Sequence, residues 1–177
     1  IERWDRYLYA PAIYWELLKE PAMTTLGDLA DVRFGTKTGN NTFFYFEEES
    51  EYEELGIDER FITPILKHIS PTEYIELQEE DPHWYVLDLR DEIDEVLDNS
   101  DESLIQQRTD EEILIEEFEN RGWDGLIQYL NHGETQDIHE GASVRSSGRA
   151  WFDVGEMPSP QLILPKEYWR DARTLYN

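Results

Sequence analysis

The chain contains no cysteine, which excludes a disulfide framework and any metal site built on thiolates. It also has few bases: 15 lysines and arginines face 41 acids, so the formal net charge is −26. No apolar run approaches the roughly 20 residues that a membrane span requires, and no secretory signal pattern is present. We therefore expect a piece of a larger cytoplasmic protein that does not enter a membrane.

Aromatic residues, in contrast, are abundant, with 6 Trp, 10 Tyr and 7 Phe among 177 residues. A disordered acidic tail would not carry so many large apolar rings, and this length is sufficient to bury a core. The acids are spread over most of the chain, which favours adaptation to high salt over an acidic protein that binds basic partners. In a salt-adapted protein the negative charge reflects the solvent, so it does not exclude DNA binding.

The pattern of apolar residues predicts a mixed α+β fold, with a twisted, mostly antiparallel sheet and flanking acidic helices. Helices are expected at residues 5–20, 91–119 and 122–133, and strands at residues 61–69, 83–89 and 161–164. The first helix should pack its apolar face in a core, and the last strand should be buried. Residues 47–59 hold eight acids and no base, which predicts a solvated loop.

Local signals refine several of these elements. Thr109 and Glu112 fit a capping box, in which each side chain binds the other residue's backbone N–H. The helix that follows should bury a stripe made of Ile113, Leu114 and Phe118. Asp124 and Gly133 are expected to cap and to stop the next helix, and Pro64 indicates a sheet edge or a bulge.

One stretch, residues 26–46, is long, polar and almost without net charge in an otherwise acidic chain. We interpret it as a strand at residues 30–34, a tight glycine-containing turn at residues 36–41 and a second strand at residues 42–46. The turn offers a cation, hydroxyls, amides and glycine-exposed backbone N–H groups, which suit phosphate oxygens and base edges. From the residues alone, a plain β-hairpin with a polar tip is the simpler interpretation.

A second balanced segment lies near the C-terminus, where residues 137–177 carry six acids and five bases. Within it, Arg145 and Arg149 flank small hydroxyl residues and a glycine. Arginine binds phosphate or guanine through two parallel hydrogen bonds, and neighbouring hydroxyls add short contacts. The alternative is that both arginines pair with surface carboxylates, which are plentiful.

Catalytic motifs are not found. The sequence has no dinucleotide-binding glycine motif, no P-loop, no nucleophile elbow and no Asn/Asp-Pro-Pro-aromatic motif. His132 and His139, with acids nearby, form only a weak metal signal. The sequence therefore argues against a self-contained enzyme and predicts neither catalytic nor metal-binding residues in this piece.

Three segments together resemble one protein family: YLYAPAIY at residues 7–14, LGDLADV at residues 26–32 and GTKTGNNTFFY at residues 35–45. They are similar to the region that follows the catalytic domain in Eco57I-like, type IIG restriction–modification enzymes, which are adenine-N6 DNA methyltransferases. The resemblance spans nearly the whole chain, with supporting matches at residues 62–67, 85–87, 129–134 and 149–153.

The resemblance implies that residues 26–177 form a DNA target-recognition domain and that residues 1–25 are a helical lead-in from an N-terminal catalytic domain. It implies a parent enzyme that uses S-adenosylmethionine and flips the target adenine out of the duplex. The implied partners are double-stranded DNA and the N-terminal methyltransferase domain of the same chain. Tyr9 departs from the Arg that is usual in the family. The family also continues beyond Asn177, which implies a longer recognition domain.

On this hypothesis the two balanced loops approach one face of the duplex, where amide and guanidinium groups read bases and the other groups hold phosphates. Two other classes stay open, namely an acidic protein–protein interaction module without DNA contact and a carboxylate metal-binding domain. The expected DNA-binding residues are Arg33, Lys37, Thr38, Asn40, Asn41, Arg145, Ser146, Ser147 and Arg149.

Overall fold

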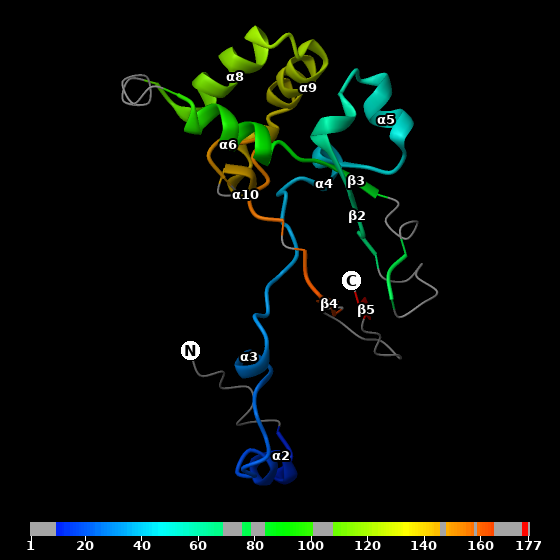
Figure 1. Cartoon of the computed structure of the whole chain (residues 1–177), viewed down its shortest axis with the longest axis vertical. Helices are drawn as coiled ribbons and strands as arrows, with labels where there is room; N and C mark the ends of the chain where they lie inside the picture. Colours follow the sequence, from blue (N-terminus) through cyan, green and yellow to red (C-terminus); the bar gives the residue numbers. More distant parts are fainter. Residues whose placement is uncertain are drawn as a thin grey trace. The chain divides into compact units, whose positions relative to one another are not determined.

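The computed structural model describes residues 10–68, 76–78, 84–100, 108–145, 148–157, 159–164 and 175–176. The chain divides into two units, residues 1–34 and residues 35–177, and each is described by itself (Figure 1).

The first unit contains helix α2, Ala12–Leu17, which starts directly after Pro11. Pro11 is the N-cap, where its fixed φ of −65° and its missing N–H carry no penalty. The helix predicted from residue 5 lies in part outside the described residues. Its predicted role in a core is wrong for the structure, because the apolar side chains of Ile13, Leu17 and Leu18 are exposed.

A second short helix, α3, spans Leu26–Leu29, and Asp28 accepts hydrogen bonds from the backbone N–H and the hydroxyl of Thr25 at 3.2 and 2.6 Å. The strand predicted at residues 30–34 is wrong, because these residues have no strand partner. Val32 and Phe34 are accordingly 61% and 71% exposed.

The second unit is built around a three-stranded antiparallel sheet with the order β1-β3-β2. Strand β1 is Tyr45–Phe46, β2 is Ile62–Ile65 and β3 is Trp84–Leu87. The predicted hairpin is wrong, since β1 pairs with β3 and not with residues 30–34. Helix α4, Asn41–Phe44, takes the first part of the predicted second strand.

Strands β2 and β3 confirm two predicted strands within the described residues, although residues 69 and 83 lie outside them. Pro64 lies in β2, which is an edge strand, as expected for a residue without a backbone N–H. Pro64 faces Tyr85 in the register, and Ile65 faces Trp84.

Three helices pack in succession beside this sheet, with α6 (Arg90–Asp98) against α8 (Asp110–Asn120) and α8 against α9 (Asp124–Thr135) (Figure 1). The predicted capping box is confirmed, because Glu112 accepts from the Thr109 N–H at 2.9 Å and Thr109 accepts from the Glu112 N–H at 3.2 Å. The predicted stripe is also confirmed, since all three side chains are buried: Ile113, Leu114 and Phe118.

The expected limits of α9 differ from the observed ones. Trp123 is the N-cap and Asp124 is the first helical residue. Gly133 does not stop the helix but lies inside it, buried in the core. A Cβ at Gly133 would stand 2.7 Å from ring atoms of Phe43 and Trp151, so the glycine is required by close packing.

The predicted acidic loop at residues 47–59 is wrong, because it contains helix α5, Glu49–Glu54, and the first residue of a 3₁₀ turn, η1 (Glu59–Phe61). Tyr52 of α5 is buried and packs edge-on against Phe46, which explains why this acidic segment is helical.

Shorter elements complete the unit: η2 (Ile138–Glu140), α10 (Ala142–Arg145) and the antiparallel pair β4 (Leu162–Ile163) and β5 (Leu175–Tyr176). The predicted burial of residues 161–164 is wrong, since Leu162 is 57% exposed. In the described part of the chain, each helix is too short or too polar to span a bilayer.

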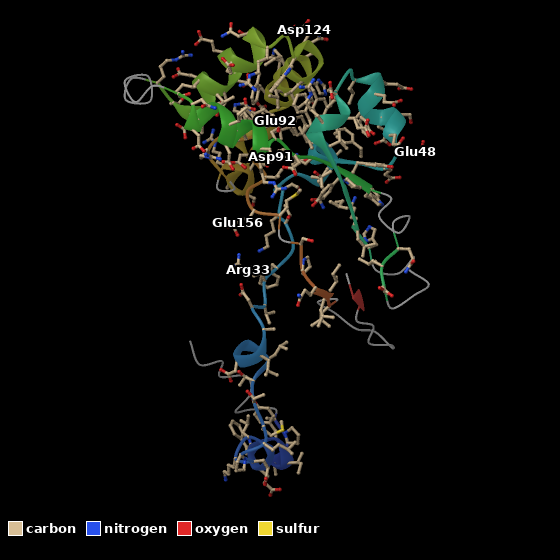
Figure 2. The ribbon with its side chains drawn as sticks, viewed as in Figure 1. Arg33, Glu48, Asp91, Glu92, Asp124 and Glu156 are labelled. Atoms are coloured by element: carbon tan, nitrogen blue, oxygen red, sulfur yellow. The ribbon has the colours of Figure 1, made fainter. Side chains whose placement is uncertain are left out.

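These elements confirm the predicted α+β class, with an antiparallel sheet flanked by acidic helices. Figure 2 labels Asp91 and Glu92 on α6, Asp124 at the start of α9 and Glu48 just before α5. The acidic groups are therefore distributed over several elements of the second unit.

Candidate functional site

The loop at residues 36–41 is shaped by two of its own polar side chains. Thr38 is only 1% exposed, and its hydroxyl donates to Oδ1 of Asn41 at 3.1 Å. Asn40 is the N-cap of α4, where its side-chain oxygen accepts from the Phe43 N–H at 3.1 Å. These two groups hold the loop, while Lys37 and Asn41 remain exposed on its surface.

The second predicted loop begins with α10. Val144 is buried, and Arg145 is exposed at the end of the helix. Nε of Arg145 donates to the backbone carbonyl of His139 at 3.0 Å, and this hydrogen bond fixes the position of Nε within the guanidinium. Ser146 and Ser147 lie outside the described residues.

The two loops meet at Gly39 and α10. Gly39 has a φ of +77°, in the left-handed region that favours glycine. A Cβ on Gly39 would stand 2.7 Å from the nitrogen of Val144 and 2.9 Å from the carbonyl carbon of Ser143. The structure therefore brings together the two segments that the sequence singled out, with the backbone of one directly against the backbone of the other.

Arg149 is oriented by carboxylates. Its guanidinium pairs with Asp94 of α6, and its Nε lies 4.0 Å from Oδ2 of Asp153. Asp153 is buried and accepts from the N–H groups of Arg149 at 3.0 Å and Gly155 at 2.8 Å. The alternative derived from the sequence, an arginine paired with carboxylates, thus describes Arg149.

Arg33 belongs to the first unit, where its Nε donates to Oδ2 of Asp31 at 2.7 Å and both side chains are exposed.

Most described arginines of the second unit have a carboxylate partner. The pairs are Arg60–Asp58, Arg90–Asp88, Arg108–Glu116, Arg121–Glu95, Arg121–Glu117 and Arg149–Asp94. Arg145 differs, because its hydrogen bond within the described residues goes to a neutral carbonyl and no ion pair joins it to an acid there. Its positive charge is therefore not neutralised by any carboxylate of the described part of the chain.

Asp88 shows how firmly a paired arginine is held. Burial would raise the pKa of Asp88, but hydrogen bonds from Arg90 and Thr63 outweigh burial and lower it. The Arg90 guanidinium lies 2.6 Å from this carboxylate. A cation in such a pair is less available to a phosphate than Arg145 is.

The part of the chain that the structure describes contains no cluster of three His, Asp or Glu side chains arranged to hold a metal. His132 and His139 thus do not form such a site with their acidic neighbours.

Two residues near the first loop, Lys67 and Trp84, were not predicted from the sequence as site residues. Lys67 lies over the ring of Trp84, and the next ring to it is that of Tyr45 at the end of α4. Lysine is scarce in this chain, and Lys67 lies only two residues after the end of β2. A rare lysine next to a predicted strand is the sequence signal that could have identified this residue.

Comparison with known proteins gives one family. The family described as "Type II methyltransferase M.Eco57I, C-terminal domain" matches residues 10–177. No curated protein and no solved structure matches the chain. The family places the chain in the context of the DNA methyltransferases of restriction–modification systems. Since the match covers nearly the whole sequence, the chain belongs to the family of the C-terminal domain of type II methyltransferase M.Eco57I.

Proposed function

We propose that this chain is the DNA target-recognition domain of an adenine-N6 DNA methyltransferase of a restriction–modification system. The observation that carries the proposal is the contact between Gly39 and the Ser143–Val144 backbone. It brings the loop that carries Lys37 and Asn41 next to the helix that carries Arg145, which supports the proposal that they share one DNA-binding surface.

The chemistry of this surface suits a duplex. Arg145 has a guanidinium that no described carboxylate neutralises, and Asn41 is an exposed residue whose amide oxygen accepts from Thr38 and whose amide nitrogen can donate to a base. An arginine on guanine or an asparagine on adenine each discriminates between bases by about 1–3 kcal/mol. Lys37 and backbone N–H groups would hold phosphates and fix the register of the domain on the DNA.

Thr38 and Asn40 take a different role in the proposal. Their side chains hold the loop and cap α4, so they position the reading groups and do not touch bases. Arg149 reaches DNA only by leaving Asp94, and a phosphate would replace that carboxylate as its partner.

The parent enzyme of this proposal carries its methyltransferase domain N-terminal to the chain. S-adenosylmethionine would supply the methyl group there, and no residue of the present chain is assigned to the cofactor. We also propose that the protein is salt-adapted, because its −26 charge is distributed over the helices of the second unit and not gathered in one tail.

The proposal is tested by selecting duplexes that bind the chain from a library of randomised DNA. We expect the selection to enrich one sequence pattern, and we expect Arg145→Ala or Asn41→Ala to relax the choice at one position each. Arg121→Ala is the matched control, since Arg121 is a cation held by two carboxylates, Glu95 and Glu117.

If no sequence is enriched and no duplex binds, the chain is not a recognition domain. An acidic interaction module then becomes the better explanation. If Arg121→Ala relaxes the preference for the selected DNA sequence as strongly as Arg145→Ala does, the DNA-reading surface has been assigned to the wrong loops.

A further inference from the structure

One face of the three-stranded sheet lies next to the loop at residues 36–41. The register places Tyr45, Val86 and Thr63 side by side, and it places Trp84 opposite Ile65 on the same face. The opposite face carries Phe46 and Tyr85, which pack against Tyr52 of α5. On the first face, the side chains of Tyr45 and Trp84 are only half-buried.

Lys67 lies over this half-buried face. Its Nζ is 3.1 Å from the centre of the Trp84 ring and 5.2 Å from the centre of the Tyr45 ring. His68, the next residue, stands edge-on to Trp84 with the ring centres 6.2 Å apart. Two aromatic rings therefore fix the position of the ammonium.

The neighbours of Lys67 leave its charge intact. An aromatic ring attracts a cation through its quadrupole but does not neutralise it. Within the described residues no carboxylate pairs with Lys67, whereas Arg60, which also lies over rings, pairs with Asp58 at 3.0 Å. Lys67 is thus a positioned positive charge that no carboxylate of the described residues neutralises, in a molecule with 41 acids.

Tyr45 connects Lys67 to the first loop. Tyr45 is the C-cap of α4, and that helix starts at Asn41 of the loop. Burial raises the pKa of the Tyr45 phenol, and hydrogen bonding with the Thr38 side chain opposes part of that rise. The ring that holds Lys67 therefore lies beside the loop proposed to contact DNA.

We infer that Lys67, held on the rings of Trp84 and Tyr45, binds a DNA phosphate and extends the recognition surface from the loop at residues 36–41 to the half-buried face of the sheet. This inference rests on the proposed function. The ligand chemistry is that of a phosphodiester backbone, because a lysine ammonium binds phosphate oxygens as a point charge. The contact adds affinity and orientation but no base preference.

Such a contact has a measurable salt signature. Each phosphate neutralised by the protein adds about −0.9 to the slope of log affinity against log salt concentration. In Lys67→Gln, binding to a fluorescent duplex of mixed sequence should weaken by about three- to tenfold and the slope should become shallower by about one. Lys67→Arg keeps the charge and should retain most of the affinity.

Arg60→Gln is the matched control, because it removes one positive charge that also lies over aromatic rings. It should change neither the affinity nor the slope. Thermal unfolding of each variant checks that the fold is kept. If Lys67→Gln binds as the unchanged protein does while Arg145→Ala loses affinity, this inference fails and the proposed function stands. If the unchanged protein binds no duplex, both fail.

Discussion

Gly39 lies so close to Val144 that a Cβ on the glycine would stand 2.7 Å from the Val144 nitrogen. Two segments far apart in the sequence are held together at this point, and the proposed DNA surface depends on the contact. The glycine serves in two ways there, since its φ of +77° and the lack of space both disfavour any side chain.

The first prediction concerns this contact. Gly39→Ala should destabilise the protein by about 1–3 kcal/mol, because it adds backbone strain and a steric overlap with α10. It should also weaken DNA binding under conditions where the variant is still folded, because the two loops are pushed apart. Denaturant unfolding and duplex titration measure the two effects.

Gly35→Ala provides the control for that change. Gly35 is in the same stretch of chain, but a Cβ there would meet nothing within 4 Å. Its replacement should leave the stability of the protein unchanged or raise it slightly, because alanine lowers the conformational entropy of the unfolded chain. Equal effects at the two glycines would show that the contact between the loops has no special importance.

The second prediction concerns the carboxylate that holds Arg149. Asp94→Asn removes the partner of the guanidinium, and DNA binding should strengthen by about two- to fivefold, because an exposed ion pair is worth about 0.2–1 kcal/mol. Asp98→Asn removes the same charge from another exposed position of α6 and corrects for general repulsion. Identical gains in the two variants would remove Arg149 from the DNA surface.

The third prediction concerns Tyr129, whose hydroxyl donates to the buried Phe43 carbonyl at 2.6 Å. Burial, with a smaller contribution from Glu51, raises the pKa of Tyr129 to about 12 from 10.0. The folded state therefore keeps the phenol proton more firmly than the unfolded state does. This stabilising contribution is complete below pH 10 and is lost as the pH rises through 12, amounting to about 2–3 kcal/mol.

Tyr129→Phe should accordingly remove one component of the alkaline loss of stability. At neutral pH it should cost about 1 kcal/mol, since the Phe43 carbonyl loses its donor. The advantage of the unchanged protein should then fall by about 2–3 kcal/mol between pH 10 and pH 12, so that Tyr129→Phe becomes the more stable of the two. A constant difference across that range would mean that Tyr129 ionises equally in both states.

Local signals in the sequence were sufficient for several elements. The capping box at Thr109 and Glu112 was predicted because both halves lie within one helical turn. Strand β3 was predicted from β-branched and aromatic residues, and the edge position of Pro64 from its missing N–H.

Predictions failed where a distant part of the chain determines the local structure. The hairpin required residues 30–34 to pair with residues 42–46, but β1 pairs with β3, which lies far along the chain. Asn40 looked like a turn residue and is in fact a helix cap. Gly133 looked like a helix stop, since nothing near it in sequence shows that Phe43 and Trp151 fill the space at its Cα.

The candidate site was predictable in part. Lys37, Asn41 and Arg145 are exposed, and their loops meet, as the shared balance of charge suggested. The burial of Thr38 and the partner of Arg149 could not be predicted, because both depend on contacts between separate elements. Lys67 was predicted only as part of the strand at residues 61–69, since the rings that hold it come from β1 and β3.

The last prediction concerns salt, for which two effects compete. Added salt weakens ion pairs such as Arg121–Glu95, but pairs with an exposed member contribute only about 0–1 kcal/mol each. It also screens repulsion in a chain with 26 more acids than bases, and the screening length falls to about 3 Å at 1 M. Repulsion should win, so the thermal midpoint should rise from dilute buffer to molar potassium chloride.

A variant with fewer acids shows whether salt raises the thermal midpoint by screening charge repulsion or by a general effect on the solvent. Glu53 and Glu54 lie on the exposed surface of the acidic helix α5. Replacing both with Gln should raise the midpoint in dilute buffer and change it little in molar salt, because the removed repulsion is already screened there. A midpoint that falls as potassium chloride is added would show that the ion pairs dominate. The acidic composition would then require a basic partner as its explanation instead of a saline solvent.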